Sequence, residues 1–426
     1  MTGDDVWCAV LSEVIDASHL VTASELVNLV NGACARVGLR AELFLADLSE
    51  RALHPIGSRT GGPEQADEAV GSLSMEGTVA GRAFRFSDLM EVARPSPDGQ
   101  LINACPVEDG GSVLWVPVVD GTDRVGVLRL ELPADIDPSD TRLRARCWTL
   151  AGLLGHLIVA KRAYSDVLHQ VRRTRPLSVA SELLGQLLPP RTFAGRDLVV
   201  AAAMEPFDQV GGDGYDYAVD DHHHAYLAVF DSTGHDVKSG LITTTVLAAT
   251  RNARRGGGDL AEMADAADQV LADTPLTGFC TALLATVDLI QGSLHYLLAG
   301  HPPPVLLRDH HAVSLPLVRP RPPLGIRPLG GISGLGTVAL QPGDRILLHT
   351  DGITEARDDS GEFFGLRGLI DHTERHEAAG LSPPETLRRI IHAVLDHQDG
   401  RLQDDATLVL FEWSTTASAM LLPARS

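Results

Sequence analysis

The sequence predicts a two-domain α+β protein whose C-terminal domain is an antiparallel β-sandwich flanked by helices. The chain has 426 residues, which is more than one typical domain. From residue 197 onward, strand-like segments come in clusters separated by turns, without strict alternation with helices. Amphipathic segments at about 238–254, 259–273 and 383–397 intervene. This pattern favours a sandwich with helices on its outer faces over a doubly wound parallel sheet.

The N-terminal domain begins with helix and hairpin signals. Thr22 and Glu25 have the spacing of a capping box, and apolar residues follow at helical intervals. Residues 41–48 and 51–56 then predict a hairpin. A polar, glycine-rich loop is predicted for residues 57–68.

A second hairpin is predicted by residues 113–119 and 125–132, because they flank Asp120-Gly121. The order of helix, hairpin, the segment 77–83 (Gly-Thr-Val-Ala-Gly-Arg-Ala) and paired strands resembles a GAF domain over residues 1–160. This resemblance implies a sensory α/β domain that binds a small ligand or dimerises. No residue identifies a ligand, and an empty or dimerising domain is favoured over one with a bound cofactor.

A long helix from about residue 142 to 171 is predicted to close this domain, and residues 161–190 form a helical linker that Pro189-Pro190 ends. The apolar stripe along the long predicted helix has two interpretations. It packs on its own domain, or it continues into a partner helix and supports a homodimer through the GAF-like domain and the linker.

Composition excludes several classes of partner. The net charge of −21 argues against binding nucleic acid or an anionic membrane, since both require basic patches. The five cysteines are widely spaced without a C-x-x-C pair, which is typical of a reduced, cytoplasmic protein. The longest apolar stretch, near residues 150–160, is too short to cross a bilayer.

Aspartates stand at the ends of several predicted strands. Asp351 follows the apolar run 345–348, Asp231 follows a second run, and Asp404 precedes a third. Asp213 lies among glycines, which permit close backbone approach. Mg²⁺ and Mn²⁺ prefer oxygen ligands, and no cluster of Cys or His competes for the role. The pattern predicts a hard-cation site, although each aspartate alone is more often a turn or cap residue.

Seven motifs occur in the family order of the PPM phosphatases, and together they resemble the bacterial branch that regulates sporulation and stress sigma factors. The match covers about residues 191–413 and leaves 414–426 as a disordered tail. The motifs are V-G-G-D-G-Y-D-Y (210–217), F-D-S-T-G-H (230–235), F-C-T-A-L-L-A-T-V-D (279–288), A-G-H-P-P-P (299–304), P-L-G-I (323–326), H-T-D-G-I-T-E-A-R (349–357) and D-D-A-T-L-V-L (404–410).

The resemblance implies an αββα phosphatase fold with two Mn²⁺ or Mg²⁺ ions and assigns roles to the acidic residues. Asp231 would bridge the ions, and Ser232 would offer its backbone carbonyl. Asp351 and Asp404 would hold the second ion, and Asp213 would act mainly through metal-bound water. Asp231 and Asp351 are therefore the predicted catalytic positions. Asp405 is ranked as a supporting residue, and His235 and His301 are interpreted as structural groups or as groups that support the ligands.

The family resemblance also implies a function. The expected reaction is hydrolysis of phosphoserine or phosphothreonine on a regulatory protein, usually an anti-anti-sigma factor, under control of the N-terminal domain. The alternative is a catalytically silent partner-binding or sensor module of the same fold. Retention of the acidic positions argues against that alternative.

Overall fold

The computed structural model describes residues 3–56, 71–92, 111–173, 178–205, 211–221, 223–234, 237–326 and 334–414, together with 416, 419 and 421–423. The chain divides into two compact units, Met1–Arg175 with Ala419–Ser426, and Pro176–Ser418. The loop predicted at 57–68 lies outside the described residues. Leu421, in the segment predicted as a disordered tail, is buried. No helix in the described part of the chain is long and apolar enough to span a membrane.

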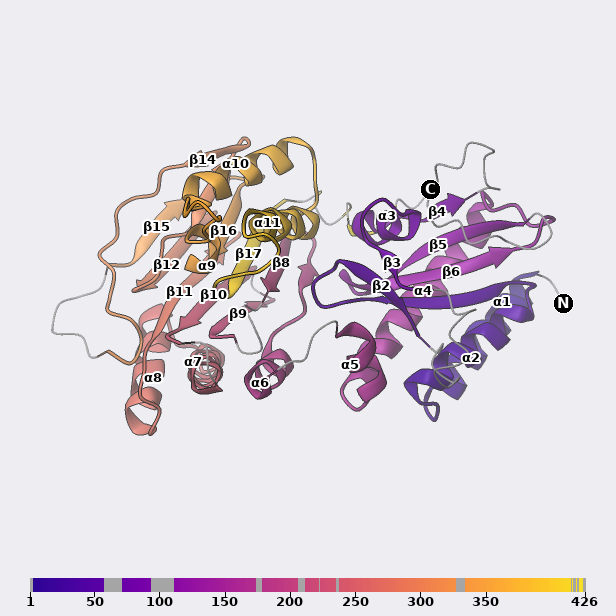
Figure 1. The fold of residues 1–426 in the computed structure, drawn as a ribbon, viewed down its shortest axis with the longest axis horizontal. Coiled ribbons are helices and arrows are strands. Elements are labelled where there is room, and N and C mark those ends of the chain that lie inside the picture. The colour runs from indigo at the N-terminus through magenta and orange to yellow at the C-terminus, as the bar shows by residue number, and fades with distance from the viewer. Residues whose placement is uncertain are drawn as a thin grey trace. The chain divides into compact units, whose positions relative to one another are not determined.

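The N-terminal unit is built on one antiparallel six-stranded sheet in the order β3-β2-β1-β6-β5-β4. Helices α1, α2, α4 and α5 lie on one face of this sheet, and α3 covers the other (Figure 1). The bounds are α1 Gly3–Ser18, α2 Ala23–Ala35, β1 Arg40–Ala46, β2 Ala52–Pro55, β3 Leu73–Ser74, α3 Val79–Phe86, β4 Met90–Val92, β5 Ser112–Asp120, β6 Asp123–Leu132, α4 Thr141–Arg162 and α5 Asp166–Arg172.

The local signals of the N-terminal unit are confirmed. Thr22 caps α2, and the reciprocal bond from the Thr22 backbone N–H to Glu25 completes the capping box. Strands β1 and β2 pair as a hairpin, as do β5 and β6. This unit is an α/β domain with a single six-stranded sheet; its GAF type stays a prediction.

The prediction of one continuous helix over residues 142–171 is wrong, because residues 163–165 separate two helices. Helix α4 ends at Arg162, and α5 begins at Asp166 after three intervening residues, with the Ser165 hydroxyl accepting a bond from the Leu168 N–H. The imidazole of His169 also contacts the Arg162 carbonyl oxygen at 3.0 Å. The break between α4 and α5 therefore coincides with the N-cap residue Ser165, and no glycine or proline lies between the two helices.

The C-terminal unit contains two antiparallel sheets, ordered β15-β12-β11-β10-β9 and β14-β13-β16-β17-β8-β7. The bounds are α6 Val179–Leu187, β7 Thr192–Ala194, β8 Leu198–Glu205, β9 Asp213–Val219, β10 His224–Ser232, α7 Val237–Arg255, α8 Leu260–Asp273, β11 Cys280–Asp288, β12 Ser293–Ala299, β13 Val305–Arg308, β14 His311–Val313, β15 Gly336–Ala339, β16 Arg345–His349, α9 Asp351–Thr354, α10 Gly365–Ala378, α11 Pro383–His397 and β17 Ala406–Trp413.

The two sheets pack face to face and form the predicted sandwich. Side chains such as Val229 from one sheet and Phe411 from the other share one buried core. Helices α7 and α8 cover the outer face of the five-stranded sheet, and α9, α10 and α11 cover the other outer face (Figure 1). The α+β class and the helix-flanked antiparallel sandwich are therefore confirmed. The short strands β7, β14 and β15 and the helix α10 were not predicted.

Candidate metal centre

The first two predicted ligands are direct neighbours in one sheet. Asp213 is the first residue of β9, and Asp231 is the last but one residue of β10. These strands run antiparallel, and their register places Asp231 opposite Asp213. Opposite residues in such a ladder have β-carbons about 5 Å apart. Asp213 is buried and Asp231 is partly exposed, so the pair opens to solvent on one side.

The other two predicted ligands flank neighbouring strands of the second sheet. Asp351 begins α9 two residues after the end of β16, and Asp404 lies two residues before β17. Gly352 lets these segments meet, because a β-carbon at this position would lie 1.9 Å from the Asp405 carbonyl oxygen. The Asp-Gly step is therefore required by close backbone packing.

Two hydrogen bonds join the sheets at this end of the sandwich. The Thr350 hydroxyl donates to Asp213 Oδ2 at 2.7 Å and accepts from the Thr407 N–H at 3.1 Å. The Asp405 carboxylate accepts from the backbone N–H of Gly212. The acidic ends of both sheets are thus held together by groups that are themselves buried.

Ser232 lies beside Gly212, and both contact helix α7. The Ser232 N–H donates to the Gly212 carbonyl oxygen at 3.1 Å. A β-carbon on Gly212 would meet the Ser232 carbonyl oxygen at 2.5 Å, so only glycine fits. Thr243 of α7 donates to the Gly212 carbonyl oxygen and contacts the Ser232 hydroxyl at 2.7 Å. Helix α7 therefore supports the backbone around both Asp213 and Asp231.

The carboxylates repel one another strongly. Burial, together with the charges of Asp351, Asp404 and Asp405, raises the pKa of Asp231 to about 7. Burial and the charges of Asp231 and Asp405 raise the pKa of Asp213 well above its usual range. Among the described residues, no basic side chain acts on either carboxyl group. Buried like charges without a counter-charge need protons or cations for compensation.

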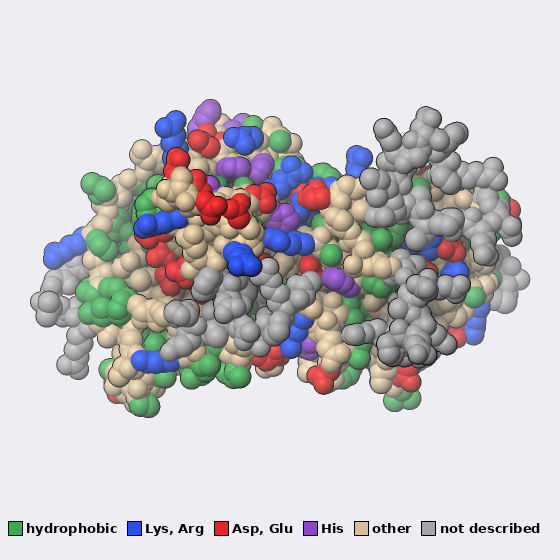
Figure 2. Space-filling view, in the orientation of Figure 1, with side chains coloured by type: hydrophobic (Ala, Val, Ile, Leu, Met, Phe, Trp, Pro, Cys, Tyr) green, Lys and Arg blue, Asp and Glu red, His purple; other side chains and the backbone are tan. Residues whose placement is uncertain are grey.

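The donor set fits hard divalent ions held partly by water. Within the described ranges, no three His, Cys, Asp or Glu side chains converge closely enough to hold one ion by themselves. Mg²⁺ does not require such a cage, because it keeps several waters and uses one or two carboxylates. Oxygen donors of this kind suit Mg²⁺ and Mn²⁺ over softer metals. Figure 2 shows how acidic side chains gather on one face of this unit.

His301 lies behind the carboxylates, and its bonds fix its tautomer. Its Nε2 lies 3.0 Å from the His349 carbonyl oxygen, which can only accept, so Nε2 carries the proton. Its Nδ1 then accepts from the Thr281 hydroxyl at 2.8 Å. Burial and the neighbouring His349 lower the pKa of His301 to about 3. His301 is a neutral structural group, as predicted. His235 lies outside the described residues.

Sequence reasoning missed Thr350 and Thr243 and left the partner of Asp405 undefined. Thr350 stands directly before Asp351 in the T-D-G motif, so its position in the sequence could have indicated a role beside the predicted ligand. Thr243 carries no local signal, because its role depends on how α7 packs against Gly212.

Residues 221–414 match the family model described as Stage II sporulation protein E (SpoIIE). The C-terminal unit contains a SpoIIE-family domain. The match includes Asp231, Ser232, Asp351 and Asp404, whereas Asp213 lies just before it.

Three curated proteins are similar to part of the chain. Protein IcfG of Synechocystis is 30% identical over 132 residues, 31% of this chain and 20% of that protein. The phosphoserine phosphatase RsbP of Bacillus subtilis is 26% identical over 45% of each chain. The phosphoserine phosphatase RsbU of the same organism is 25% identical over 55% of this chain and 69% of that one. The chain thus spans less than half the length of the first two.

Solved structures similar to the chain include the RsbU and RsbW domains of Rv1364c from Mycobacterium tuberculosis, with 24% identity, a TM-score of 0.45 and coverage of 54% of this chain and 62% of that one. The SiaA-PP2C domain of Pseudomonas aeruginosa has 23% identity, a TM-score of 0.45 and coverage of 62% and 98%.

Proposed function

We propose that the C-terminal unit is a protein phosphatase that hydrolyses phosphoserine or phosphothreonine with two Mn²⁺ or Mg²⁺ ions. The observation that carries this proposal is the meeting of Asp213, Asp231, Asp351 and Asp404 at one end of the sandwich. Four segments of the chain supply negative charge there, and burial together with mutual repulsion raises the pKa values of three of the four carboxyl groups.

Each residue of the candidate metal centre has a proposed role that follows from its position. Asp231, whose carboxylate is affected by the charges of three other aspartates, would bridge the two ions. The backbone carbonyl oxygen of Ser232 would be a further ligand of the first ion. Asp351 and Asp404 would hold the second ion, and Asp213 would orient water through its carboxylate. When bound, such ions lower the pKa of water and neutralise charge on a phosphoryl group. Thr350 and Asp405 would keep the acidic residues in place.

The proposed substrate is a phosphorylated regulatory protein of the anti-anti-sigma type. Support comes from the SpoIIE-family match and from two relatives that are named phosphoserine phosphatases. Ser/Thr phosphoproteins fit an exposed acidic site loaded with metal, because the ions supply the positive charge that the surrounding residues lack.

The proposed regulation acts through α6 and α7. Gly240 of α7 packs against α6, since a β-carbon there would lie 2.4 Å from the Ala180 β-carbon. One turn further along α7, Thr243 donates to the Gly212 carbonyl oxygen. A shift of α6 would therefore reach the backbone that carries Asp213. The N-terminal unit would exert control through the segment that leads into α6.

Activity measurements separate this function from a catalytically silent module. We expect hydrolysis of p-nitrophenyl phosphate and of a phosphoserine peptide with Mn²⁺, and loss of both with a chelator. Asp231→Asn and Asp351→Asn should each lower kcat at least about a hundredfold, because each removes a charge that holds metal. Asp288→Asn, at the end of β11 where its carboxylate accepts from the Ile290 N–H of the following turn, is a matched control that should retain activity. Activity that survives both site substitutions contradicts the metal assignment, and an inactive metal-loaded wild type favours the silent module.

A further inference from the structure

The α3 side of the N-terminal sheet contains a buried arginine with an unused binding edge. Arg129 lies on β6, and its side chain is only 2% exposed. Its Nη1 contacts Glu42 Oε2 at 3.0 Å and Glu131 Oε1 at 2.6 Å. Its Nε and Nη2 are buried and have no hydrogen-bond partner among the residues that the structure describes.

Nε and Nη2 lie along one edge of the planar guanidinium group. Nε–H and one Nη2–H point in parallel, which is the geometry that binds a carboxylate through two hydrogen bonds. Nη1 lies on the other side of the planar group, so this edge faces away from Glu42 and Glu131. A buried donor without an acceptor is costly, and here two adjacent donors lack one.

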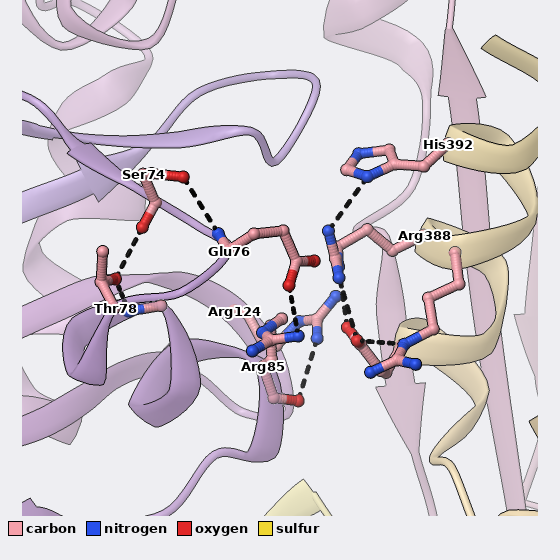
Figure 3. A network of polar contacts seen from close by, with 10 residues as sticks. Ser74, Glu76, Thr78, Arg85, Arg124, Arg388 and His392 are labelled. Carbon is pink, nitrogen blue, oxygen red and sulfur yellow. Dashed lines mark hydrogen bonds and ion pairs between the residues drawn. The ribbon is translucent and has the colours of Figure 1, made fainter. Parts of the chain in front are cut away.

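The neighbouring arginines behave differently. Arg85 pairs with Glu76 at 2.9 Å, and Arg124 pairs with Glu50 at 2.7 Å while it covers the Phe84 ring. Figure 3 shows the Arg85–Glu76 pair beside the start of α3, where the Thr78 hydroxyl donates to the Ser74 carbonyl oxygen. Ion pairs therefore hold both of these arginines, and Arg129 differs from them in having two adjacent donors, Nε and Nη2, without a partner among the described residues.

The surroundings define the chemistry of a ligand. Arg40 approaches Glu42 and Glu131 at 3.8 and 4.0 Å, so the two arginines and the two glutamates sum to no net charge. A monoanion is tolerated in such a place better than a phosphate dianion. Trp115, the direct cross-strand neighbour of Arg129 on β5, is apolar, buried and in contact with the Phe44 ring.

We infer that the N-terminal unit binds a small carboxylic acid with an apolar body, whose carboxylate accepts both hydrogen bonds from the Nε–Nη2 edge of Arg129. The apolar body lies toward Trp115. This site is independent of the phosphatase activity proposed for the other unit.

Titration calorimetry and thermal unfolding of the full chain test the inference, with hexanoate, benzoate and phenylacetate as probes. At least one acid should bind and raise the unfolding temperature, whereas benzamide and inorganic phosphate should not. If none of the acids binds, or if phosphate binds as tightly as the best acid, the inference is overturned.

Two variants distinguish binding from a structural role of Arg129. Arg129→Lys keeps the charge beside both glutamates but removes the paired donors, so affinity should fall about tenfold or more. Glu131→Gln keeps the shape but removes a negative charge, so the acid should bind more tightly. Unchanged affinity in folded Arg129→Lys, or weaker affinity in Glu131→Gln, would refute the assignment.

Discussion

The hydroxyl group of Thr350 connects the two sheets at the acidic centre. Thr350 is fully buried and bonds to Asp213 in one sheet and to the Thr407 backbone in the other. Since outer groups that orient a metal ligand typically change affinity by about 10–100-fold, Thr350 should matter almost as much as a ligand.

Thr350→Val should weaken Mn²⁺ binding by about tenfold and destabilise the fold by about 1–3 kcal/mol, because it removes one hydrogen bond to the Asp213 carboxylate and the acceptor of the Thr407 N–H. Thr350→Ser keeps the hydroxyl and is the matched control. Calorimetric Mn²⁺ titrations and urea unfolding of the three proteins measure both effects. Equal Mn²⁺ affinity in the valine and serine variants would show that the bond does not orient Asp213.

His301 makes stability depend on pH. Its pKa is lowered to about 3 in the folded protein, mainly by burial, against an ordinary value of 6.5. Between these values the unfolded chain binds the extra proton, so stability falls as the pH drops below about 6.5. The slope for one proton is at most about 1.4 kcal/mol per pH unit.

His301→Gln should flatten this dependence, since glutamine does not titrate yet can donate to His349 and accept from Thr281. Urea unfolding of both proteins without metal, at several values between about pH 6.5 and 4.5, gives the comparison. Parallel pH profiles for the two proteins would mean that His301 is not kept neutral by the fold.

At the scale of elements, local signals were predictable and tertiary ones were not. The capping box at Thr22 and the turn at Asp120-Gly121 act through neighbouring residues, so the sequence alone indicated α2 and the β5–β6 hairpin. The break after α4 was missed because Ser165 gives a weak signal inside an apolar periodicity. The pairing of Asp213 with Asp231 depends on the register of β9 against β10, and the sequence analysis did not predict which residues of these two strands lie opposite each other.

Gly352 makes one such tertiary requirement testable. Its missing β-carbon allows α9 to lie against the backbone at Asp405, and even alanine would place an atom 1.9 Å from a carbonyl oxygen. We expect Gly352→Ala to cost about 1–3 kcal/mol, since neither backbone can yield cheaply, and to weaken Mn²⁺ binding by displacing Asp351.

Gly185→Ala is the control for this substitution. Gly185 lies within α6 with no atom within 4 Å of an added β-carbon. Alanine there should stabilise the helix by up to about 1 kcal/mol. Denaturant unfolding and Mn²⁺ titration of both variants provide the measurement. If Gly352→Ala proves as benign as Gly185→Ala, the close contact between α9 and the Asp405 backbone is not a constraint.

At the scale of the whole molecule, the sequence indicated two domains because of its length and because its patterns change at residue 197, and each compact unit has its own buried cores. The unused edge of Arg129 was not predictable, since a lone arginine in a strand looks like an ordinary cross-strand partner of glutamate. Its significance depends on burial, which only the folded sheet defines.

Deletion of residues 1–175 tests whether the two units act together. The remaining unit keeps both sheets and their cores, so it should fold. If the preceding chain restrains α6 against Gly240 of α7, its removal loosens the support that Thr243 gives to Gly212. Coupling between sites is typically 1–3 kcal/mol, so Mn²⁺ affinity should fall by about fivefold or more.

Mn²⁺ titration and p-nitrophenyl phosphate hydrolysis by the full chain and by the fragment measure this coupling. Thr243→Val in the full chain provides a matched comparison, because it removes the proposed last step of the coupling while keeping both units. If the coupling runs through α7, the deletion should have little further effect in the Thr243→Val background, since the link is already broken. Identical affinity and rate in the fragment and the full chain would instead mean that the N-terminal unit does not control the metal centre, and its carboxylic acid site would then serve some other output.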